Sequence, residues 1–224
     1  MSDSSVRDDA VYGVVDEEAA GALREILTDP ALPVAALVSD LPTVDGVHIA
    51  ALREALDYVT SRRIAAGVTE SVDAASALDA GLSRVDPALA ATLRWHGVLG
   101  PVLAALPPTR SRNAVLGDVH RGDLLTWAPT VRSWTWVSGS APGAEAPIGR
   151  AEAEIEVDDF PGLYDAILVW EPTVAAVVVV PTHRDRVSWE PAAAAGRWVV
   201  RLAKATVHAD ELIALDSVPH QLAS

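Results

Sequence analysis

Cysteine is absent from the sequence. This absence excludes disulfide scaffolds, thiolate zinc sites, iron–sulfur clusters and cysteine nucleophiles. Long apolar runs are also lacking, because no uncharged apolar stretch approaches the roughly twenty residues that a bilayer crossing needs. The apolar run at 174–181 is short and rich in β-branched residues, which favours a buried strand.

Basic residues are outnumbered, with 17 lysine and arginine residues against 31 aspartate and glutamate residues and a formal net charge of −14. Because the arginines are scattered and form no basic stripe, nucleic acid is a disfavoured partner. The start of the chain is polar and acidic where a secretory leader would be charged and then apolar, which predicts a cytoplasmic protein. No histidine pair has metal-ligand spacing and no nucleophile elbow occurs, so neither a metal site nor hydrolase chemistry is expected.

Helical spacing of apolar residues dominates the chain as far as about residue 121. Asp16 is the expected N-cap of a first helix, which stops before Asp29-Pro30. Caps and glycine stops predict further helices from about 45 to 66, from the caps Thr69 and Ser71 to about 85, from Asp86-Pro87 to about 106, and from 110 to near Gly122.

From Asp123 onward, short β-branched and aromatic runs replace the helical spacing. Alternation places Glu152, Glu154 and Glu156 together on the solvent side of a sheet. Helices first and strands second indicate an α+β fold, in which an all-α domain precedes a mainly antiparallel, barrel-like β domain. The expected units are a disordered lead-in at 1–12, a helical domain at 13–121, a β domain at 122–216 and a tail at 217–224. Strands are predicted at 123–128, 133–139, 150–157, 164–170, 174–180, 186–190 and 197–207.

Five segments carry a resemblance to the N-terminal and middle domains of acyl-CoA dehydrogenases, and together they span roughly residues 15–216. They are "SRVDPALAATLRWH" (83–96), "GDVHRGDLLTWA" (117–128), "FPGLYDAILVW" (160–170), "VVVVPT" (177–182) and "RLAKATVHADELIAL" (201–215). The resemblance implies a flavoprotein with FAD as cofactor, an acyl-CoA ligand and a homo- or hetero-oligomer. A full-length acyl-CoA dehydrogenase subunit is one implied partner.

The resemblance also implies a flavin site, from which this sequence departs. The family's "T-E-P-x-x-G-S-D" turn, laid on Pro129, reads "W-A-P-T-V-R-S-W", so the implied site residues are Trp127, Pro129, Thr130 and Ser133. In the family's later "W-I-T" segment a hydroxyl lies beside the flavin, and here Asp159 takes that place. A carboxylate near the negatively charged reduced flavin would oppose reduction by about 1 kcal/mol or more.

The family's base-bearing helical bundle has no counterpart in the sequence, so the chain resembles a truncated member without a catalytic glutamate. The first hypothesis is therefore an oxidoreductase subunit that acts on CH–CH bonds only if a partner supplies the base. The second is a non-catalytic binding or regulatory module that kept the scaffold and lost the flavin. The third is an unrelated α+β domain that binds an apolar small ligand.

Several residues allow a functional and a structural interpretation. Trp134 and Trp136 share one strand face, which would suit either flavin or acyl stacking or ordinary sheet packing, and packing is favoured. His96 is expected to be an interhelical core histidine. The segment 182–186 ("THRDR") would suit a phosphate contact or a solvated hairpin, and the hairpin is favoured. Without a covering bundle, Trp127, Trp134 and Val199 are expected to be exposed, which predicts an oligomer.

Overall fold

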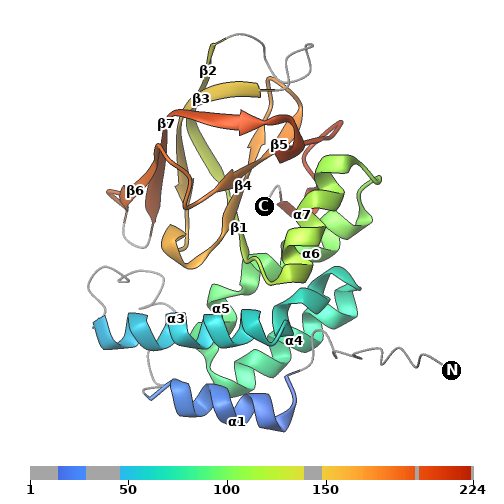
Figure 1. Cartoon of the computed structure of the whole chain (residues 1–224), viewed down its shortest axis with the longest axis vertical. Helices are drawn as coiled ribbons and strands as arrows, with labels where there is room; N and C mark the ends of the chain where they lie inside the picture. The colour runs from blue at the N-terminus through green and yellow to red at the C-terminus, as the bar shows by residue number, and fades with distance from the viewer. Residues whose placement is uncertain (1–14, 29–45, 139–147, 195–196, 223–224) are drawn as a thin grey trace, which may run out of the picture.

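The computed structural model describes residues 15–28, 46–138, 148–194 and 197–222. Its helices gather at one end of the molecule and its strands at the other, with α7 beside the strands (Figure 1). No helix in these ranges is long and apolar enough to span a bilayer. The helices are α1 (Glu17–Ile26), α3 (Gly46–Ser61), α4 (Val72–Val85), α5 (Pro87–Thr92), α6 (Arg94–Ala105) and α7 (Arg110–Arg121), and the 3-10 turn η1 (Ile64–Thr69) follows α3.

Four of the predicted helix caps are confirmed, whereas Thr69, the other cap considered for the helix that begins at 72, lies within η1. The Asp16 carboxylate accepts the backbone N–H of Ala19 at 2.8 Å, and the Ser71 hydroxyl caps α4. The Asp86 carboxylate accepts two N–H groups at the start of α5. Gly122 ends α7 with a φ of +114°, a left-handed conformation that favours glycine.

Two helices differ from the prediction. The helix expected to reach residue 66 ends at Ser61, because Arg63 adopts a left-handed φ of 54° and the chain continues as η1. The long helix expected from 87 to 106 breaks at Leu93 into α5 and α6. There the Tyr164 hydroxyl donates to the Thr92 carbonyl, which in an unbroken helix would accept an N–H from the following turn.

The strands form two four-stranded sheets, ordered β1-β4-β5-β8 and β2-β3-β7-β6. All pairs are antiparallel except β1–β4, which is parallel. The predicted succession of a helical layer and a mainly antiparallel β layer is confirmed, but the described strands do not close into a barrel. The strands are β1 (Leu125–Ala128), β2 (Thr130–Ser138), β3 (Ile148–Val157), β4 (Ala166–Glu171), β5 (Ala176–Pro181), β6 (Val187–Pro191), β7 (Trp198–His208) and β8 (Leu212–Ala214), of which only β8 was not predicted.

One hydrophobic core runs through both layers. The expected exposure of Trp127 and Val199 is wrong, because their exposed fractions are 2% and 3%. β1, which carries Trp127, packs against α6 on one side and β3 on the other. Val199 lies in register between Glu156 and Glu190, which pair with Arg132 and Arg201.

The expected solvent face of β3 holds for only part of its length. Glu152 is exposed and Glu154 half-buried, whereas Glu156 is 8% exposed. Glu156 tolerates this burial because Arg132 and Arg197 both pair with its carboxylate. The trio therefore lies on one face, as the alternation indicates, but one end of that face is covered.

Two glycines one turn apart on α6 test how closely this helix packs on η1. A Cβ atom at Gly100 would lie 3.0 Å from the Cβ and 3.1 Å from the backbone carbonyl carbon of Val68, whereas one at Gly97 would meet no atom within 4 Å. We expect Gly100→Ala to lower the free energy of unfolding by about 1–3 kcal/mol through overpacking. The matched control Gly97→Ala should raise it by up to about 1 kcal/mol through helix propensity. Urea unfolding measures both, and equal effects of the two variants would contradict the close α6–η1 contact.

Candidate functional site

His96 connects three elements at the junction of the helical and β layers. Its side chain is 1% exposed. The backbone N–H of Leu125 in β1 donates to Nδ1 at 3.2 Å, and Nε2 lies 3.1 Å from the Ala65 carbonyl in η1. Because Nδ1 must accept, Nε2 carries the proton and donates to Ala65. Burial lowers the pKa of His96 to about 4, so the ring is neutral. The predicted role as a core histidine is confirmed.

A second buried polar cluster surrounds Asp159, which is 9% exposed. The Thr126 hydroxyl donates to Asp159 Oδ2 at 3.2 Å. Burial raises the pKa of Asp159 to about 6, although the Thr126 hydrogen bond and the positive charge of Arg94 lower it. Burial and the nearby Asp159 charge also raise the pKa of Tyr164 well above its ordinary value. The cluster joins β1 and the segment after β3 to the start of α6.

The site residues implied by the resemblance do not converge on one cavity. Trp127 and Asp159 are interior, whereas Pro129 and Ser133 are exposed and Thr130 is half-buried on β2. The β2–β3 register places Thr130 opposite Glu156 and Ser133 opposite Glu154.

These residues do not fit a flavin in the family's manner. At the first position of the turn, where the family has a threonine, this chain has the buried indole of Trp127. At the hydroxyl position of the family's "W-I-T" segment it has the buried carboxyl of Asp159. The accessible residues Thr130 and Ser133 lie opposite Glu156 and Glu154, whose carboxylates are paired with arginines. The flavin assignment of these residues stays a prediction, and the burial of Trp127 and Asp159 argues against it.

The neighbouring tryptophans Trp134 and Trp136 match the packing alternative. Their rings lie 5.5 Å apart in an edge-to-face arrangement, and both half-buried side chains pack against the core. Among the described residues, no group of three or more histidine, aspartate or glutamate side chains is arranged to hold a metal ion.

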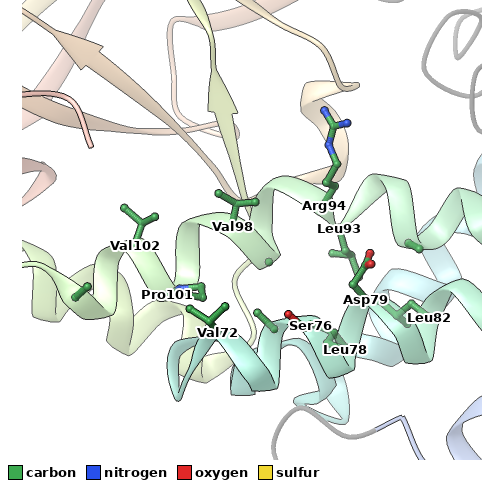
Figure 2. Close-up of a pocket in the computed structure, with 14 residues that line it drawn as sticks. Val72, Ser76, Leu78, Asp79, Leu82, Leu93, Arg94, Val98, Pro101 and Val102 are labelled. Carbon is green, nitrogen blue, oxygen red and sulfur yellow. The ribbon is translucent and has the colours of Figure 1, made fainter. Parts of the chain in front are cut away.

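Sequence reasoning missed an apolar groove of about 560 Å³ between α4, α5 and α6. Val98, Pro101 and Val102 of α6 and Val72 of α4 are among its lining residues, and Figure 2 shows Pro101 lying toward Val72. Val72 is 67% exposed. The sequence signal was the second apolar stripe of α6, because His96, Leu99 and Leu103 face the core and the valines lie on another side.

Polar side chains border the groove at few positions. Ser76 and Asp79 lie on its α4 wall, and Arg94 borders it where α6 begins. In Figure 2 the Arg94 side chain extends away from α4. Arg94 therefore belongs both to the groove and, through its charge on Asp159, to the buried cluster. The arrangement suits an apolar ligand.

The two buried titratable groups affect stability in opposite directions. The pKa of Asp159 is raised in the folded state, so its contribution to the free energy of unfolding is present below about pH 4 and is lost as the pH rises to about 6. The pKa of His96 is lowered in the folded state, so its contribution to the free energy of unfolding is present above about pH 6.5 and is lost as the pH falls to about 4. Each contribution is on the order of 3 kcal/mol, and the two nearly cancel between pH 4 and 6.

Single variants should reveal these opposed slopes in urea unfolding across that pH range. Relative to the unsubstituted protein, Asp159→Asn should lose stability as the pH falls from 6 to 4, and His96→Gln should gain it. The double variant should follow the unsubstituted protein's slope. Equal slopes in both single variants would contradict these protonation states.

Comparisons with known proteins place the fold. No family model and no curated protein matches the sequence. Among solved structures, FMN-bound TdsC from Paenibacillus sp. A11-2 matches with a TM-score of 0.57 at 13% identity, covering 88% of this chain and 54% of that one. A glutaryl-CoA dehydrogenase from Mycobacterium smegmatis in complex with FADH2 gives 0.52 at 13%, covering 93% and 58%. The ChsE4-ChsE5 complex from Mycobacterium tuberculosis gives 0.53 at 13%, covering 92% and 58%.

This chain thus spans a little over half the length of the structures it matches. The likeness is one of fold, since the sequence identities are low. It covers both the helical layer and the two sheets. The described residues adopt the fold of the N-terminal and middle domains of acyl-CoA dehydrogenases.

Proposed function

We propose that the chain is a binding module of the acyl-CoA dehydrogenase fold that takes an acyl chain into the α4–α6 groove and holds no flavin of its own. The observation that carries this proposal is the groove itself. Its volume of about 560 Å³ falls within the range of roughly 300–1,000 Å³ that is usual for small-molecule sites. Its walls are mostly aliphatic, which suits a hydrocarbon chain.

The charged residues beside the groove do not favour an anion inside it. Asp79 lies at the same end of the groove as Arg94, and the Arg94 side chain extends away from α4 (Figure 2). An acyl ligand would therefore be held by the aliphatic walls and not by a charge. In this proposal the chain's residues bind the ligand, and none of them is assigned proton abstraction.

The absence of a flavin in this proposal rests on Trp127 and Asp159. Placing an isoalloxazine beside them would require moving a buried indole away from the core. It would also require a reduced, negatively charged ring to lie near a carboxyl group whose burial already raises its pKa to about 6. Both requirements oppose flavin binding at this position.

A second candidate is an oxidoreductase subunit that acts on CH–CH bonds of acyl-CoA substrates. In this case further chain, from the same polypeptide or a partner, would supply the base and the surface that holds FAD. Two observations favour it: the chain spans 58% of the matched chain in the ChsE4-ChsE5 structure, and that structure is a complex. The two candidates differ in whether flavin accompanies the protein.

Flavin content separates the candidates. We expect the purified protein to be colourless, to release no flavin on denaturation and to leave the fluorescence of added FAD unchanged, because Trp127 and Asp159 occupy the implied contacts. A yellow preparation with stoichiometric flavin would contradict our proposal and support the subunit candidate. Repeating the titration with a full-length acyl-CoA dehydrogenase present tests the shared-site form of that candidate.

Acyl binding is tested by filling the groove from Gly97, where a Cβ atom would meet nothing within 4 Å. We expect Gly97→Leu to weaken binding of a fluorescent fatty-acid analogue by about tenfold or more, equivalent to at least about 1.4 kcal/mol, because its side chain enters the groove. Gly21→Leu on α1 is the matched control, since Gly21 also has open space and lies outside the groove. Both changes favour the helix. Equal affinity in the two variants would refute binding in the groove.

A further inference from the structure

A depression of about 280 Å³ in the β layer is lined by Arg150, Arg184, Asp185, Arg186 and Thr206. Two of its arginines come from residues 182–186, the segment for which the sequence left a phosphate contact open. The fold adds Arg150 from β3 and Thr206 from β7, which are opposite each other in the strand register and so lie on one face. Three guanidinium groups thus border one small hollow in a chain whose net charge is −14.

The arginines have different partners. Arg184 is held by the carboxylate of Glu211, with Nη1 at 2.7 Å from Oε2, and it also donates to the Thr206 carbonyl at 2.5 Å. The side chains of this ion pair are only 21% and 14% exposed. Arg184 is therefore neutralised and fixed as part of the wall.

Arg150 and Arg186 differ from Arg184, because no described carboxylate neutralises their charge. Within the described ranges, no carboxylate pairs with either of them. Asp185 is the acidic residue of the lining, and both arginines are exposed. With Asp185 counted, the lining keeps one net positive charge, and the planar guanidinium donors match phosphate oxygens in pairs.

Contacts within the protein fix the backbone around Arg186 without a ligand. Arg186 has a φ of 68° and Lys204 a φ of 58°, both in the left-handed region. The Arg186 carbonyl accepts the Ala203 N–H at 2.9 Å, and Arg186 Nη1 donates to the Lys204 carbonyl at 3.5 Å. The paired contacts hold the turn against β7 at the edge of the depression.

From this arrangement we propose that the depression binds a phosphate group, with Arg150 and Arg186 as its charged ligands and the Thr206 hydroxyl as a neutral donor. The site lies outside the α4–α6 groove, because the two share no lining residue. The proposal therefore stands independently of acyl binding. Its ligand is either free phosphate or the phosphate end of a phosphomonoester.

The test measures binding of inorganic phosphate and of phenyl phosphate to the full chain by isothermal titration calorimetry at constant ionic strength. We expect saturable binding of phosphate, and the double variant Arg150→Gln/Arg186→Gln should weaken it by about tenfold or more. Phenyl phosphate binding as tightly as inorganic phosphate would assign the site to esters, whereas weaker binding would assign it to the free anion. Arg184 is left intact because its buried pair with Glu211 supports the fold.

A matched control removes the same charge elsewhere, through Arg84→Gln/Arg110→Gln in the helical layer. This control should retain the phosphate affinity of the unsubstituted protein. No saturable binding, or an equal loss in both double variants, would overturn the proposal. Retained binding of the fatty-acid analogue in the Arg150→Gln/Arg186→Gln variant would show that the apolar groove binds its ligand independently of the phosphate site.

Discussion

The joining of the two layers depends on a neutral imidazole. His96 can accept from Leu125 and donate to Ala65 only in one tautomer and only without a second proton. Its burial enforces that state by lowering the pKa to about 4. His96 thus joins the helical layer, the turn η1 and the first strand, and it acts together with the core that runs through both layers. Because α6 also forms a wall of the apolar groove, the same contact places the candidate ligand site.

The buried cluster around Asp159 is the second contact between the helical layer and the sheets. Trp127 fills space with an indole, and Thr126 and Arg94 compensate the charge of Asp159. Tyr164 adds a hydroxyl that reaches back to α5 and interrupts the helix there. These contacts form a polar interior that connects the layers.

Local signals in the sequence predicted much of the fold. A helix cap acts within a few residues, so its effect can be predicted from the sequence. This holds for Asp16, Ser71, Asp86 and the left-handed Gly122. The break at Leu93 was not, because it depends on Tyr164, which is far along the chain. The burial of Trp127 and the groove on α6 also depend on packing between distant elements. The resemblance indicated the fold correctly, whereas the positions of its implied site residues required coordinates.

The order of the strands has a consequence for self-association. In the first sheet the most apolar strands, β4 and β5, are central, and the edges are β1 and β8, which have four and three residues. A short edge leaves few unpaired backbone N–H and C=O groups for another chain to extend. In the second sheet one edge is β6, which ends in Pro191 and so lacks a donor at that point. The valine-rich interior is thereby shielded from intermolecular β-pairing, the route by which such segments form aggregates.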